Sequence, residues 1–263
     1  MKKTIAFLLA CILCAAFAFA ACAEVTQAEV EELIIGKWML ADKNGRPALT
    51  NEKMVITVES TDKAFLSTSR FGEKGMKSIW HHQMEAEVTI DSHTVTVTRI
   101  ANVEQASVQE FNVTKISNRE FLANRKWTRT NKGEEPQTLH DILRFVKITD
   151  DFSDDIIGTW EGRCTSEGSV FDDGQEHRWE YKADGTFVYY VKDGDNWVPA
   201  KDELNEYFVD GILHCTRWVE NGEESREWWE IAIDGDRMNW TALRTDENGN
   251  GFTATFEMTK VHE

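Results

Sequence analysis

The chain has 263 residues and a formal net charge of −17, and its acidity is unevenly distributed. Residues 22–150 carry 17 basic and 19 acidic side chains, whereas residues 151–263 carry 10 and 27. A field of that sign repels phosphate backbones, so the composition excludes nucleic acid as a partner. It favours a solvated acidic surface over cation binding.

The first 21 residues are predicted to form an export signal, in which Lys2 and Lys3 precede an apolar run too short for a spanning helix. Phe19-Ala20-Ala21-Cys22 resembles a bacterial lipobox, with Phe where Leu, Val or Ile is usual, and would leave a lipidated Cys22 as the mature N-terminus. Ordinary signal-peptidase cleavage after Ala20 or Ala23 also fits. We therefore expect an exported protein, either periplasmic or an outer-membrane lipoprotein that contacts the membrane only through its anchor.

Residues 22–34 are predicted to form a short helix and linker. Thr26 and Glu29 have the spacing of a capping box, in which each side chain satisfies a free backbone amide of the other residue. Val30, Leu33 and Ile34 follow at helical spacing. We expect one or two turns that act as a plug or lid.

The remainder of the chain is an internal repeat. The segment Leu33–Trp38 (LIIGKW) returns as Asp155–Trp160 (DIIGTW), and the order of later matches is kept while their offset falls from 122 to 113 residues. Two copies of one domain are therefore predicted at residues 35–149 and 155–263, joined by a short acidic linker.

Each copy has the pattern of about eight short strands. In the second copy, alternating segments are separated by turn signals such as Ala183-Asp184-Gly185, Asn221-Gly222 and Asp234-Gly235, with no helical pattern between them. Such a meander removes its edge strands by closing into a barrel. The predicted fold class is all-β, with two tandem eight-stranded antiparallel up-and-down barrels.

A Gly-x-Trp strand opens each copy, at Gly36–Trp38 and Gly158–Trp160. Each strand resembles the opening strand of lipocalins and of bacterial lipocalin-like domains. The resemblance implies that Trp38 and Trp160 close the barrel bottoms as structural residues. It also implies a basic residue across each Trp, where Lys147 and Lys260 stand in place of the usual Arg, in a cation–π contact of about 0.5–2 kcal/mol.

Seven of the ten tryptophans lie in the second copy. Because alternate strand residues face opposite sides, an aromatic interior is predicted there. It either fills the barrel or lines a pocket for a flat or apolar molecule. Arg217 is a candidate partner for an anionic ligand group, or else for an acidic side chain. The candidate ligand-binding residues are Trp179, Tyr181, Phe187, Tyr189, Arg217, Trp229 and Trp240.

Cys164 and Cys215 are the cysteines beyond the export segment, and an oxidising compartment would permit a disulfide between them. Their strands lie roughly opposite each other, so only a flattened barrel would bring them within reach. We expect no metal and no cofactor. His81-His82 face opposite sides of a strand, and the calcium-loop pattern from Asp246 to Glu257 lies in a predicted hairpin.

The sequence therefore predicts a non-enzymatic binding protein of the cell envelope that holds a small apolar or aromatic molecule in the second barrel. The alternative is a structural or interaction module with filled barrels, which would bind another envelope protein. An enzyme on a barrel frame is a third interpretation, but no catalytic arrangement is visible.

Overall fold

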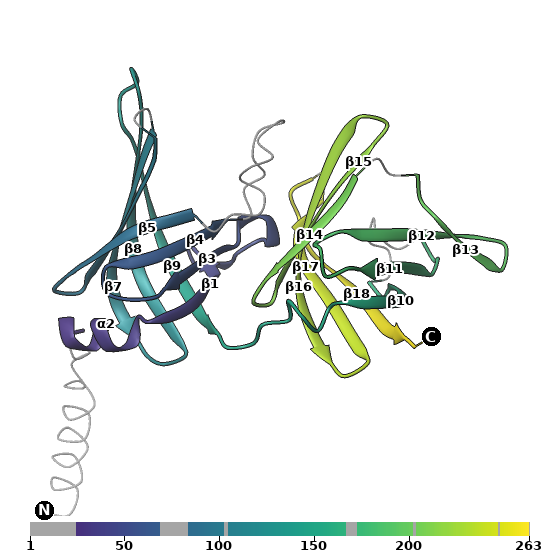
Figure 1. Cartoon of the computed structure of the whole chain (residues 1–263). Coiled ribbons are helices and arrows are strands. Elements are labelled where there is room, and N and C mark those ends of the chain that lie inside the picture. Colours follow the sequence, from purple (N-terminus) through teal and green to yellow (C-terminus); the bar gives the residue numbers. More distant parts are fainter. Residues whose placement is uncertain are drawn as a thin grey trace, which may run out of the picture.

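The computed structural model describes residues 25–68, 84–102, 105–166, 173–201, 204–246 and 248–262, which form two all-β bodies in sequence order (Figure 1). Residues 1–24, with Cys22, and the pair His81-His82 lie outside the described residues. No helix among the described residues is long and apolar enough to span a membrane.

The first body is a closed eight-stranded antiparallel barrel. Its ring runs β1-β3-β4-β5-β6-β7-β8-β9, and pairing of β1 with β9 closes it, while β2 only extends the β1 hairpin. The elements are β1 (Gly36–Lys43), β2 (Arg46–Pro47), the 3-10 turn η1 (Thr50–Glu52), β3 (Met54–Val58), β4 (Lys63–Thr68), β5 (Met84–Asp91), β6 (Thr94–Asn102), β7 (Gln105–Ile116), β8 (Glu120–Asn131) and β9 (Gln137–Ile148).

Helix α2 (Gln27–Leu33) precedes this barrel and has the predicted capping box. The amide of Glu29 donates to Thr26 Oγ1 at 3.3 Å, and the amide of Thr26 donates to Glu29 Oε2 at 2.9 Å. Val30 and Ile34 are buried in the apolar core of the first barrel. The helix therefore packs against the barrel interior, as expected of a plug.

The second body is a curled nine-stranded antiparallel sheet in the order β13-β12-β11-β10-β18-β17-β16-β15-β14. It contains β10 (Gly158–Cys164), β11 (His177–Tyr181), β12 (Phe187–Asp193), β13 (Asn196–Pro199), β14 (Leu204–Asp210), β15 (Leu213–Glu220), β16 (Glu223–Asp234), β17 (Arg237–Thr245) and β18 (Gly251–Val261). The tandem all-β barrel architecture matches the prediction.

Ring closure differs between the two bodies. Between the start of β12 and the edge strand β14, the described residues pair through an isolated bridge between Thr186 and Glu206, with a backbone bond from Tyr207 N to Gly185 O of 2.8 Å. The short strand β13, which the sequence did not predict, extends β12 into a hairpin that reaches away from the body (Figure 1). The second barrel is therefore open along one side.

The same set of contacts stands at the start of the opening strand of each body. Trp38 Nε1 donates to Ile34 O, and Trp160 Nε1 donates to Ile156 O, both at 2.7 Å. Lys147 Nζ lies 5.0 Å from the Trp38 ring centroid, and Lys260 Nζ lies 5.0 Å from that of Trp160. The predicted cation–π contacts are confirmed in both copies.

The two bodies share a buried interface. An apolar cluster joins Met39, Val55 and Ile148 of the first body to residues of the second. The second body contributes Leu213, Cys215 and Trp228, which point outward from β15 and β16. Ion pairs Lys37–Asp210 (2.7 Å) and Lys53–Glu230 (3.0 Å) flank the cluster.

Candidate functional site

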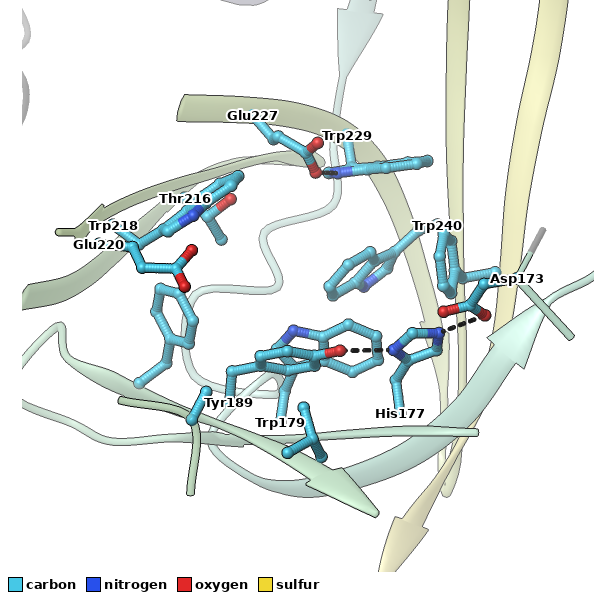
Figure 2. A pocket seen from close by; sticks show the side chains of 14 residues that line it. Asp173, His177, Trp179, Tyr189, Thr216, Trp218, Glu220, Glu227, Trp229 and Trp240 are labelled. Atoms are coloured by element: carbon cyan, nitrogen blue, oxygen red, sulfur yellow. Dashed lines mark hydrogen bonds and ion pairs between the residues drawn. The ribbon is translucent and has the colours of Figure 1, made fainter. Parts of the chain in front are cut away.

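The second barrel contains a cavity of about 450 Å³ between the β12–β13 hairpin and strand β15. This volume is within the range of small-molecule sites. Figure 2 shows Trp218, Glu220 and Glu227 along one side of the cavity, and Tyr189, Trp179 and His177 along the other. The lining residues are Asp173, His177, Trp179, Phe187, Tyr189, Val191, Ala200, Thr216, Trp218, Glu220, Glu227, Trp229, Trp240 and Phe256.

Aromatic rings form the inner wall of the cavity. Trp179 of β11 lies 4.9 Å from Trp240 of β17 and 5.5 Å from Tyr189 of β12, measured between ring centroids. Trp240 lies 5.6 Å from Trp229 and 5.8 Å from Phe256. These tilted arrangements fix the ring faces that a flat ligand would contact.

His177 joins two other polar side chains of the site. Its Nδ1 is 2.7 Å from the Tyr189 hydroxyl, and its Nε2 is 3.2 Å from Asp173 Oδ1. Burial alone would raise the pKa of Asp173, but the backbone hydrogen bond from Gln175 and the charge of His177 outweigh it and lower this pKa. This row of groups holds the Tyr189 hydroxyl in a fixed position at the cavity wall.

Two glutamates face the cavity from β15 and β16. Glu227 accepts a hydrogen bond from Trp229 Nε1 at 3.0 Å. Burial raises the pKa of Glu227, although the Arg244 charge and the Trp229 bond act in the opposite direction. The Arg244 guanidinium lies 4.8 Å from the Trp229 ring centroid. Glu220, at the exposed end of β15, forms no ion pair within the part of the chain that is described.

A polar group of buried side chains lies beneath the cavity. His214 is fully buried, 5.0 Å from the Trp240 ring and 5.3 Å from the Tyr181 ring. Among the described residues, neither ring nitrogen of His214, nor the Tyr181 hydroxyl, nor Trp240 Nε1 has a hydrogen-bond partner. Burial lowers the pKa of His214 to about 3 and raises that of Tyr181. Trp240 thus offers an unused donor next to the cavity.

The structure brings together five of the seven predicted ligand-binding residues. Trp179, Phe187, Tyr189, Trp229 and Trp240 all line the cavity. Tyr181 is buried beneath it, in edge-on contact with Tyr207.

The prediction for Arg217 is wrong. Strand β15 turns Thr216 and Trp218 toward the cavity, and Arg217 therefore faces the outer side of the sheet. There it pairs with Glu206 at 2.6 Å and Glu224 at 3.2 Å, which is the acidic-partner alternative.

Sequence reasoning missed His177, Trp218, Glu220 and Glu227 as cavity residues. His177 shares strand parity with Trp179 and Tyr181, which were predicted to face inward. The same parity rule, applied to polar residues as well as aromatic ones, would have placed His177 in the site.

The possible disulfide is not formed, because no bond joins Cys164 to Cys215. Cys164 packs in the interior of the second barrel, whereas Cys215 points outward into the interface with the first body. The two thiols face opposite sides of the sheet. Burial raises the pKa of Cys215, so this thiol is held in its unreactive form.

The calcium-loop pattern lies in a hairpin, as predicted. Asp246 Oδ1 accepts from the amides of Asn248 and Asn250 at 2.9 and 2.7 Å, so the loop satisfies this carboxylate itself. Within the described ranges, no three His, Cys, Asp or Glu side chains are grouped to hold a metal ion.

No family model and no curated protein matches the chain. Its function is therefore inferred from the cavity and the residues that line it.

Proposed function

We propose that this chain is an exported, non-enzymatic binding protein that holds a small apolar or aromatic molecule in the second barrel. The observation that carries the proposal is the cavity of about 450 Å³, walled by the rings of Trp179, Tyr189 and Trp240 and open at one side. A scaffold with filled barrels would place no such space at the centre of its aromatic residues.

The asymmetry between the two bodies supports this assignment. The first barrel closes its hydrogen-bonded ring and packs one apolar core beneath helix α2. The second keeps the same Trp–Lys closure at Trp160 but leaves a side open. We propose that the first barrel acts as spacer or partner surface, and that the architecture is lipocalin-like.

The N-terminal sequence supports a place in the cell envelope. We propose that the mature chain is periplasmic, or is anchored to the outer membrane by a lipid on Cys22.

The uncharged fluorophore N-phenyl-1-naphthylamine tests the ligand site. Its emission is expected to rise and shift to the blue, with saturation, when it is titrated with the mature chain, because the cavity excludes water. The variant Ala200→Trp places an indole in the cavity and is expected to weaken binding at least tenfold.

The matched control is Ala183→Trp, which adds the same side chain at an exposed turn and is expected to bind as the wild type. Absence of saturable binding to the wild type would reject the proposed function. Equal binding by the wild type and Ala200→Trp would place the fluorophore elsewhere.

A further inference from the structure

Carboxylates predominate among the charged side chains that line the cavity. The described lining residues include three carboxylates, of Asp173, Glu220 and Glu227, and no Lys or Arg. Asp173 is engaged by His177, whereas Glu220 and Glu227 lie on the side of the cavity facing Tyr189 and Trp179 (Figure 2). A molecule in this space therefore has ring faces on one side and carboxylates on the other.

Such an arrangement suits a positive charge. An organic cation within about 6 Å of an aromatic centroid gains roughly 0.5–2 kcal/mol from the ring quadrupole. Tyr189, Trp179 and Trp218 present rings to the cavity. The nearby cations Arg178 and Lys192 of the chain itself lie against a different ring, that of Trp197.

Arg244 is the basic residue whose positive charge acts on the carboxylate of Glu227. Its guanidinium lies over the Trp229 ring and donates to Trp228 O at 3.2 Å. Its charge acts to lower the pKa of Glu227, but the effect of burial is larger. Glu220 has no basic partner in the described part of the chain. Two carboxylates therefore face the cavity with one basic group beside them.

We propose that the ligand is an organic ammonium ion with an apolar or aromatic body, held between the aromatic wall and the carboxylates of Glu220 and Glu227. This inference rests on the proposed function and adds the charge of the ligand to it. Burial already disfavours the charged form of Glu227, so a bound cation would stabilise its carboxylate. The acidic second domain also concentrates cations near the opening.

Displacement of N-phenyl-1-naphthylamine by two isosteric compounds tests the charge. Benzyltrimethylammonium carries the positive charge, and neopentylbenzene has the same shape without it. The cation is expected to bind the mature chain at least tenfold more tightly, and 0.5 M NaCl is expected to reduce this preference.

The variants Glu220→Gln and Glu227→Gln remove charge at nearly constant shape. In Glu227→Gln the new amide retains a carbonyl acceptor for Trp229 Nε1. The double variant is expected to lose the preference for the cation while its affinity for neopentylbenzene stays within twofold. Glu223→Gln is the matched control. Glu223 is exposed and does not line the cavity, and its backbone lies opposite that of Glu220 in the β15–β16 hairpin.

The outcomes separate the two proposals. If the fluorophore binds but the two compounds compete equally, or if the double variant keeps the preference, the cation inference is overturned and the binding function stands. If no fluorophore binding is seen, both proposals fail.

Discussion

At the scale of single residues, His214 links the site to the pH dependence of stability. Its imidazole is buried without a hydrogen-bond partner among the described residues, and its pKa falls from 6.5 to about 3 on folding. The folded state therefore takes up its proton only near pH 3, whereas the unfolded chain takes it up near pH 6.5. Stability contributed by neutral His214 is complete above pH 6.5 and is lost as the pH falls toward 3.

This linkage predicts that the wild-type chain loses about 2 kcal/mol of unfolding free energy between pH 7 and pH 5 through His214 alone. The variant His214→Leu removes the titrating group, and other groups titrate alike in both proteins. Urea denaturation at the two pH values is expected to show a correspondingly smaller loss for the variant. Equal losses would mean that folding does not lower the pKa of His214.

The glycine of each Gly-x-Trp strand has a role that composition alone does not reveal. Gly36 and Gly158 adopt φ of +133° and +126°. A Cβ atom would lie 2.5 Å from Lys147 Cε at Gly36 and 2.9 Å from Lys260 Cε at Gly158. These positions need glycine for two reasons. A positive φ disfavours other residues, and a side chain would clash with the lysine that packs over the tryptophan ring.

We therefore expect Gly158→Ala to destabilise the chain by about 3 kcal/mol, from backbone strain together with displacement of Lys260. Gly194→Ala is the matched control, because Gly194 has φ of +62° and nothing within 4 Å of the place that a Cβ would take. Its cost should be about 1 kcal/mol. Urea midpoints measure both, and equal costs would contradict a role for the lysine contact.

At the scale of elements, strand alternation predicted much of the site. In β11 and in the first part of β17, large apolar residues alternate with polar ones, so Trp179 and Trp240 were placed correctly. The rule failed on β15, where Leu213 to Arg217 are all buried. The first body covers part of the outer face of this strand, so apolar residues occur on both sides and the sequence no longer distinguishes them.

The open side of the second barrel could not be predicted from the chain. Ring closure depends on pairing between strands far apart in sequence, and each hairpin turn looks the same whether or not the ring closes. Asp193-Gly194-Asp195 carries the same kind of turn signal as the predicted hairpins, but β13 after it contains four residues and ends at Pro199. A strand this short has too little alternation to be detected.

At the scale of the whole molecule, the interface makes the two bodies one mechanical unit. Trp228, in the apolar cluster of the interface, is 3% exposed. The side chain of Asp210, which pairs with Lys37, is also 3% exposed. The amide of Leu243 donates to Thr50 Oγ1 across the same interface at 2.8 Å. Separation of the bodies would expose these groups without their partners.

Calorimetry of the wild-type chain is therefore expected to give a single unfolding transition. Trp228→Ala is expected to cost about 3–5 kcal/mol and to split the transition in two. Trp197→Ala is the matched control. Trp197 lies on β13, away from the interface, and its ring packs against Arg178 and Lys192. Two transitions in the wild type would show that the interface does not couple the bodies.

At the open side of the second barrel, residues that border the cavity lie apart from the central strands of the sheet. Val191 and Ala200 border the cavity from the β12–β13 hairpin, and the outer strand of that hairpin is an edge of the sheet. Substitutions here alter the size and chemistry of the cavity without breaking a ladder between central strands. The Trp160–Lys260 contact lies on other strands, β10 and β18. On the proposed function, ligand preference would be free to change among descendants of this gene while the scaffold stays constant.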